Sequence, residues 1–103
     1  MKKVLGLATC FNRKEKTVAA IKALTEGNPT LSFDFIITDD GSSDGTSEAL
    51  KQFSNVMVLH GDGNLYYSGG MRMAIEEAKK TANQYDYCLL FNDDVKFYDH
   101  SIE

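Results

Sequence analysis

Apolar residues follow two different spacings along the chain. Four short runs are almost continuously apolar or β-branched, as buried strands are: 4–10, 33–38, 56–59 and 87–91. In the segments between these runs, apolar residues recur every three or four positions, which is typical of the inner face of a helix. Strands that alternate with helices of this length predict βαβ units and a parallel sheet. The right-handed crossover rule restricts the topology but leaves several strand orders open.

The predicted helices carry signals for their ends. Asn12, followed three residues later by Glu15, has the pattern of a capping box, and Gly27 with Pro29 predicts the end of this first helix. Asp44 or Ser43 is the expected cap of a second helix. The predicted inner faces are Val18, Ile21 and Leu24 in the first helix, Ala49, Leu50 and Phe53 in the second, and Met71, Ala74, Ile75, Ala78 and Ala82 in the third. A glycine-rich loop over residues 61–70 precedes the third helix.

Composition restricts the class of protein. The 103 residues suit one domain, and 43% hydrophobic with 25% charged residues indicates a globular chain. The net charge of −4, with no Lys/Arg run longer than two, does not indicate a nucleic-acid partner. Cys10 and Cys88 lie in predicted strands and have no zinc-site spacing. No apolar stretch is long enough for a transmembrane helix or a signal peptide. The predicted location is the cytoplasm, with a peripheral position at the cytoplasmic membrane face as an alternative.

Polar segments end three of the predicted strands, at residues 9–13, 39–46 and 92–94. Parallel strands bring such segments to one edge of the sheet, where open α/β sheets bind ligands. Asp39 and Asp40 could accept hydrogen bonds from a base or from ribose hydroxyls, or they could simply stabilise turns. Asp93 and Asp94 are costly at the end of an apolar strand unless they are solvated, paired or bound to a cation. Magnesium and manganese favour carboxylate oxygens and commonly bridge to phosphates, although capping of a turn is an equal alternative.

These segments together resemble a known family. Residues 9–13 (TCFNR), 39–46 (DDGSSDGT) and 92–95 (NDDV) resemble, in order and spacing, the N-terminal half of a family 2 glycosyltransferase. The acidic segment 39–46 after an apolar strand is the most specific part, and the resemblance covers nearly the whole chain. Residues 61–75 are also similar to the rhamnosyltransferase-like branch of this family.

The resemblance implies a Rossmann-like, three-layer GT-A nucleotide-binding half, with a four-stranded parallel sheet of order 3-2-1-4 and flanking helices. It implies transfer of a sugar from a nucleotide-diphosphate donor to an acceptor hydroxyl, with inversion. Residues implied to bind the nucleotide donor are Thr9, Phe11, Arg13, Asp39, Asp40, Gly41 and Asp93. Asp39 would accept from the base and Asp40 would lie just behind it. Asp94 and Asn92 would hold a manganese or magnesium ion, which neutralises charge on the leaving diphosphate.

The sequence departs from the family pattern in three places. Asn92 replaces the first acid of the Asp-x-Asp motif, and Phe11 stands where tyrosine is common. Arg72 stands where a small polar residue is expected, and it either reaches the diphosphate or is solvated. The family's general base and its acceptor-binding elements belong to the C-terminal half. The resemblance therefore assigns no catalytic residue to this chain, which we interpret as the donor-binding domain, residues 1–103, of a longer enzyme of polysaccharide biosynthesis.

Other classes fit the sequence less well. A non-catalytic module that keeps the fold for nucleotide binding or for homo-oligomerisation through an exposed sheet edge is the main alternative. A receiver domain would need its acid pair after the first strand, and a dinucleotide-binding domain would need a G-x-G-x-x-G motif there. The sugar, the base, the choice of metal and the acceptor, whether saccharide or lipid-linked, are left open by the sequence.

Overall fold

The computed structural model of the chain describes residues 2–91. It contains the strands β1 (Lys2–Cys10), β2 (Leu31–Asp39), β3 (Val56–His60) and β4 (Tyr87–Leu90). The helices are α1 (Lys14–Gly27), α2 (Thr46–Leu50) and α3 (Tyr66–Ala78), and a 3₁₀ helix, η1, spans Ala82–Gln84. Strands and helices alternate along the chain, as the spacing of apolar residues predicts.

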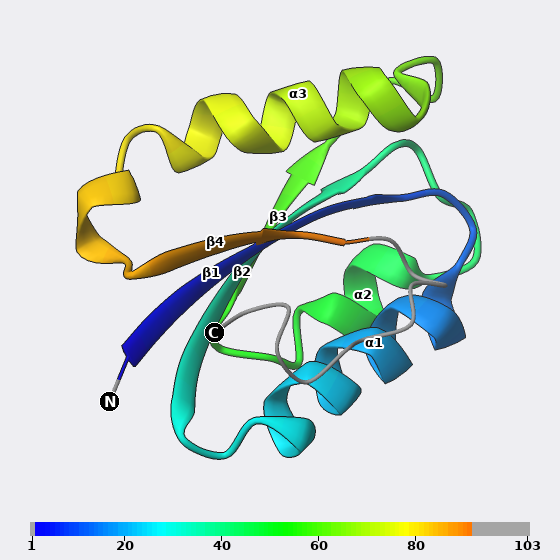
Figure 1. The fold of residues 1–103 in the computed structure, drawn as a ribbon. Coiled ribbons are helices and arrows are strands. Elements are labelled where there is room, and N and C mark those ends of the chain that lie inside the picture. Colours follow the sequence, from blue (N-terminus) through cyan, green and yellow to red (C-terminus); the bar gives the residue numbers. More distant parts are fainter. Residues whose placement is uncertain (1, 92–103) are drawn as a thin grey trace.

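The four strands form one parallel sheet of order β3-β2-β1-β4 (Figure 1). The β1–β2 pairing runs from Lys2 beside Leu31 to Cys10 beside Asp39, so these two strands end together. The fold class and strand order implied by the family resemblance are therefore confirmed.

Helices cover both faces of the sheet, α1 and α2 on one face and α3 on the other (Figure 1). Because successive side chains of a strand point to opposite faces, each central strand contributes to two separate cores. The core beneath α1 and α2 consists of Val4, Ala8, Cys10, Ala20, Ile21, Leu24, Phe33, Phe35, Ile37, Leu50 and Phe91. The core beneath α3 consists of Leu5, Leu7, Ile36, Met71, Ala74 and Ala78. The two central strands, β1 and β2, are thus packed on both faces, and this packing fixes the position of the polar residues at their carboxyl ends.

Aromatic packing explains the glycine within β1. The ring of Phe35 lies 5.6 Å from that of Phe33 and 5.9 Å from that of Phe91, measured between centroids. A Cβ added at Gly6 would lie 2.7 Å from the Phe35 ring, which no real Cβ tolerates. Gly6 therefore makes room for the aromatic cluster of the larger core.

Three predictions about helix ends are wrong. Helix α1 begins at Lys14 after Arg13, with no side-chain cap, because the Asn12 side chain accepts a hydrogen bond from the next loop instead. The residue before α2 is Gly45, not Asp44 or Ser43, because the chain enters this helix in the left-handed conformation that glycine favours. Helix α3 begins at Tyr66, within the segment predicted to be a loop, and ends before Ala82, which belongs to η1.

The inner faces agree better with the sequence. Ile21 and Leu24 of α1, Leu50 of α2, and Met71, Ala74 and Ala78 of α3 are buried as predicted. None of the helices in residues 2–91 combines the length and the apolar character needed to cross a bilayer.

Candidate functional site

The predicted site residues of β1 and β2 come together at the carboxyl edge of the sheet. Thr9 pairs with Thr38 and Cys10 with Asp39, so the ends of the two strands lie side by side. The loops that follow them, and the starts of all three helices, gather at this same edge (Figure 1). Phe11 and Arg13 lie in the first loop, and the Phe11 side chain is 52% exposed. This arrangement brings the predicted base-binding residues within one region.

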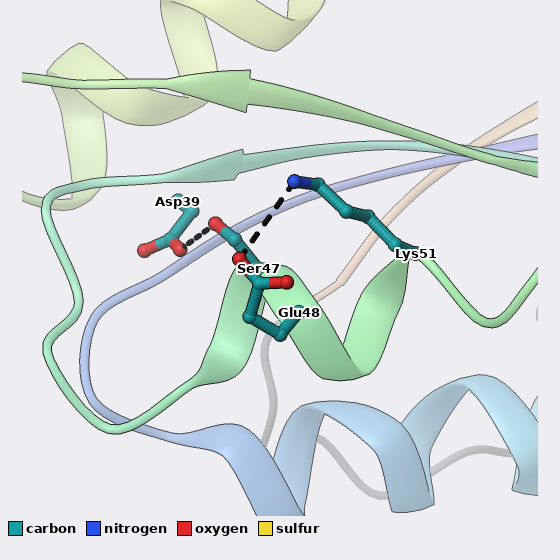
Figure 2. Close-up of polar contacts among 4 residues, drawn as sticks. All are labelled: Asp39, Ser47, Glu48 and Lys51. Carbon is teal, nitrogen blue, oxygen red and sulfur yellow. Dashed lines mark hydrogen bonds and ion pairs between the residues drawn. The ribbon is translucent and has the colours of Figure 1, made fainter.

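Asp39 ends β2 and faces α2. Its carboxylate is 3% exposed, and one oxygen, Oδ1, accepts the Ser42 N–H at 3.0 Å. The other oxygen, Oδ2, accepts a hydrogen bond from the hydroxyl of Ser47 in α2 (Figure 2). These two bonds fix the orientation of the Asp39 carboxylate.

Asp40 faces the opposite side of the sheet, because it is the next residue along the chain. Its side chain is 4% exposed. Oδ1 accepts the Gly63 N–H at 2.9 Å, and Oδ2 accepts the Leu65 and Tyr66 N–H groups, each at 3.0 Å. Gly63 and Leu65 belong to the β3–α3 connection, and Tyr66 is the first residue of α3. The adjacent carboxylates therefore serve different loops on different faces.

The loops after β1 and β2 are linked to each other. The Asn12 N–H donates to the Ser42 hydroxyl at 2.8 Å, and the Ser43 N–H donates to Asn12 Oδ1 at 2.8 Å. The Lys14 N–H, at the start of α1, donates to Asp44 Oδ2 at 3.1 Å. Asp44 thus binds the first residue of a helix some thirty residues away, as well as its own neighbour.

Asp44 has a lowered carboxyl pKa. The hydroxyl of Thr46 donates to Asp44, and this bond, aided by the N–H groups of Lys14 and Thr46, lowers the carboxyl pKa below its ordinary value. Asp44 is therefore held as a carboxylate that orders the two loops.

Helix α3 packs directly on the ends of β1 and β2. The Thr38 hydroxyl donates to the Gly70 carbonyl at 2.9 Å, and a Cβ added at Gly70 would lie 2.1 Å from Thr9 Oγ1. The side chain of Thr9 therefore lies against α3. Sequence reasoning missed Thr38, Ser47 and Gly70, because hydroxyls and glycines inside elements give no pattern of their own.

The predicted metal site cannot be placed. Asn92, Asp93 and Asp94 lie outside the described residues, so their roles stay predictions. Within residues 2–91 there is no group of three or more His, Cys, Asp or Glu side chains arranged to hold a metal ion.

Two further predicted residues lie within the described part of the chain. Arg72 is exposed on α3, and Gly41 has a φ of 82° in the turn after Asp40.

The comparisons agree with the geometry. The family model for glycosyl transferase family 2 matches residues 7–103. Searches of curated proteins and of solved structures gave no match. The matched region includes the end of β1 with Thr9, the whole of β2 with Asp39, and the whole of the linked loops. From its fold, its carboxyl-edge loops and this match over most of its length, the chain belongs to glycosyl transferase family 2.

Proposed function

We propose that this chain binds the donor of an inverting, metal-assisted glycosyltransferase. Family membership indicates a nucleotide-sugar donor. The observation that carries the proposal is the position of Thr9 and Asp39 on neighbouring strands, at the edge where α/β sheets bind ligands.

Asp39 is the residue proposed to recognise the base. A carboxylate offers about four acceptor positions, and the two bonds to Ser42 and Ser47 occupy one on each oxygen. Each oxygen therefore retains capacity for a further donor, such as the N–H of a base. Because a carboxylate only accepts, it discriminates against a base that presents an acceptor at that point.

The other proposed donor contacts surround this acid. Thr9 and the exposed ring of Phe11 line the base pocket, while Arg13 supplies positive charge at the same edge. Gly41 allows the turn after the strand, since its φ of 82° is strained for other residues.

Manganese or magnesium is proposed to bind to Asp94 and Asn92. Asp93 is proposed to approach the ribose. Oxygen ligands of this kind suit both ions. The ion would neutralise charge on the leaving diphosphate. The resemblance of residues 61–75 to the rhamnosyltransferase-like branch belongs to the same proposal.

A titration followed by NMR tests the proposal. The ¹⁵N-labelled chain is titrated with ADP, GDP, CDP, UDP and dTDP, with and without magnesium. We expect one nucleotide to give saturable shifts centred on residues 9–13, 39–46 and 92–94, and Asp94→Ala to abolish the effect of magnesium. Asp34→Asn, at the opposite end of β2, is the control and should bind as the parent does. A folded sample that shows no saturable shift with any nucleotide contradicts donor binding.

Oligomerisation through the sheet edge is a second candidate. Strand β4 is at one edge of the sheet, and its Leu90 side chain is 51% exposed. Among the described residues, no strand pairs with the outer side of β4, and an edge of this kind favours strand pairing between copies. Sedimentation over a range of concentrations, with Leu90→Lys as the disrupting variant, tests it. Equal monomeric behaviour of both proteins would exclude the oligomer.

A further inference from the structure

The Asp40 carboxylate is engaged entirely by one loop and the helix residue that follows it. Three backbone N–H groups, from Gly63, Leu65 and Tyr66, donate to its two oxygens at 2.9–3.0 Å. Asp40 is 4% exposed and Asp39 is 3% exposed, so the bonding partners, and not burial, distinguish the two acids. A carboxylate in this position serves the β3–α3 connection, because it faces that loop rather than the loops after β1 and β2.

The contact between Asp40 and this loop is close on both sides. A Cβ added at Gly61 would lie 2.5 Å from Asp40 Oδ1. Tyr66, the first residue of α3, has a φ of 56°, which a non-glycine residue adopts only when its surroundings require it. The N–H of this strained residue donates to Asp40. Asp40 thus fixes the point at which α3 begins.

The start of α3 in turn fixes Thr9. Gly70 lies one turn after Tyr66, and its carbonyl accepts a hydrogen bond from the Thr38 hydroxyl. The Cα of Gly70 lies so close to Thr9 that no side chain fits between them. A shift of the helix start would therefore change the surroundings of Thr9, which is proposed to line the base pocket.

We propose that Asp40 is a positioning residue of the donor site and makes no contact with the nucleotide. It holds residues 61–66 and the start of α3, and through Gly70 it sets the position of Thr9. This inference rests on the proposed donor site and changes one of its members, because the family resemblance counts Asp40 among the donor contacts.

Asp40→Asn tests this role at constant size. An amide offers one oxygen and one NH₂ group, so at least one of the three backbone donors loses its acceptor. In the nucleotide-free protein, we expect the amide signals of Gly63, Leu65 and Tyr66 to move, and those of Thr9 and Gly70 to move with them. Asp34→Asn, which changes an acid within β2 on the same face, should leave Thr9 and Gly70 unmoved.

Nucleotide binding separates positioning from contact. Asp40→Asn should weaken binding of every nucleoside diphosphate about tenfold, as expected for a lost bond to a charged acceptor, and keep their rank order. Asp39→Asn should instead change the rank order, because it alters a base contact. A changed rank order in Asp40→Asn, or parent-like affinity despite a displaced loop, overturns the inference. Absence of binding by the parent chain is a different result, which refutes the proposed function itself.

Gly61→Ala approaches the same contact from the loop and keeps Asp40 intact. Its added methyl meets Asp40 Oδ1, so the variant should weaken all nucleotides by a similar factor. Both substitutions disrupt the same contact. The double variant, Asp40→Asn with Gly61→Ala, should therefore bind nucleotides no more weakly than whichever single variant has the lower affinity. Additive losses would overturn the inference. If Asp40→Asn does not fold, Gly61→Ala alone decides: an unchanged rank order with weaker binding supports positioning, and parent-like binding refutes it.

Discussion

The two edges of the sheet differ in how their connections are built. In the part of the chain that the structure describes, every residue with positive φ lies at the carboxyl edge: Asn12, Gly41, Gly45, Gly63 and Tyr66. The connections at the amino edge, over residues 28–30, 51–55 and 79–86, have none. Backbone strain is thus concentrated at the edge that carries the candidate site.

The hydrogen bonds differ in the same way. At the amino edge the connections bond within themselves or to strands, as Leu31 does to Asn28, Asp86 to Lys3 and Tyr85 to Asp34. At the carboxyl edge the connections bond to one another, Asn12 to the loop after β2 and Asp40 to the loop after β3. Strained residues persist only where surrounding bonds hold them, and such places are typical of binding sites. The comparison therefore supports the proposed site at the carboxyl edge without reference to any motif.

Asp34 in β2 and Asp40, which directly follows β2, give the largest expected difference between the edges. Asp40→Ala leaves three backbone donors without their acceptor, so it should lower the free energy of unfolding by about 3 kcal/mol. Asp34→Ala removes one bond, from the Tyr85 hydroxyl at 2.7 Å, at an exposed site, and should cost less than about 1 kcal/mol. Urea unfolding followed by circular dichroism measures both values.

Equal losses for these two variants would contradict the comparison, since both acids lie in or directly after one strand, on one face.

Thr38→Val extends the test, because it removes the hydroxyl that bonds Gly70 while it keeps the side-chain shape. We expect its loss to lie between those of the two acid variants, at about 1–2 kcal/mol.

Two glycines give a contrast of opposite sign. Gly41→Ala places a Cβ 3.1 Å from the Gly63 Cα at a φ of 82°, and it should destabilise the fold by about 1–2 kcal/mol. At the end of α1, Gly27→Ala meets no atom within 4 Å and should stabilise the fold by about 0.5–1 kcal/mol. Thermal unfolding of the two variants should therefore shift in opposite directions. Destabilisation by Gly27→Ala as large as that by Gly41→Ala would show that local backbone conformation does not separate the edges.

Much of the fold could be predicted from the sequence, because buried parallel strands and inner helix faces leave strong periodic signals. Phe35 and Leu24 are examples, since both lie in apolar patterns and both are buried. The first residues of the helices were harder to predict from the sequence. Asn12 has the residue type of a cap, but its side chain accepts the Ser43 N–H from another loop, and no local pattern contains that partner.

The candidate site was predictable only in part, for a similar reason. The strand ends that carry Thr9 and Asp39 follow from the apolar runs and the parallel topology. The division between Asp39 and Asp40 depends on which loop reaches each face, and this is a property of the packed chain. In the sequence Asp39 and Asp40 form one acidic pair, whereas in the structure their carboxylates face opposite sides of the sheet and bind different segments.

Acid tests the link between the loops of the carboxyl edge. The pKa of Asp44 is below its ordinary value of 3.8, chiefly because the Thr46 hydroxyl donates to it. The stabilisation is therefore complete above the unfolded pKa and is lost as the pH falls through the lower, folded pKa. Asp44→Asn should be less stable than the parent at neutral pH, and the difference in melting temperature should narrow on acidification below about pH 4. Glu48→Gln, in an exposed pair with Lys51 at 3.7 Å, is the control and should show little difference at any pH.

The smallest expected effect belongs to the amino edge. Burial, with the hydrogen bond to Asp34, raises the pKa of Tyr85 from 10.0 to about 12. Its contribution to stability is complete below pH 10 and is lost as the pH rises toward the folded value, so it is constant at neutral pH. Tyr85→Phe keeps the ring and should cost less than about 1 kcal/mol at neutral pH, while it removes a phenol transition at about pH 12 from an absorbance titration. A titration curve unchanged by Tyr85→Phe would refute the raised pKa. Because Tyr85 contacts Asp34 at the amino edge and none of the residues proposed to bind the donor, nucleotide affinity should be the same in Tyr85→Phe as in the parent.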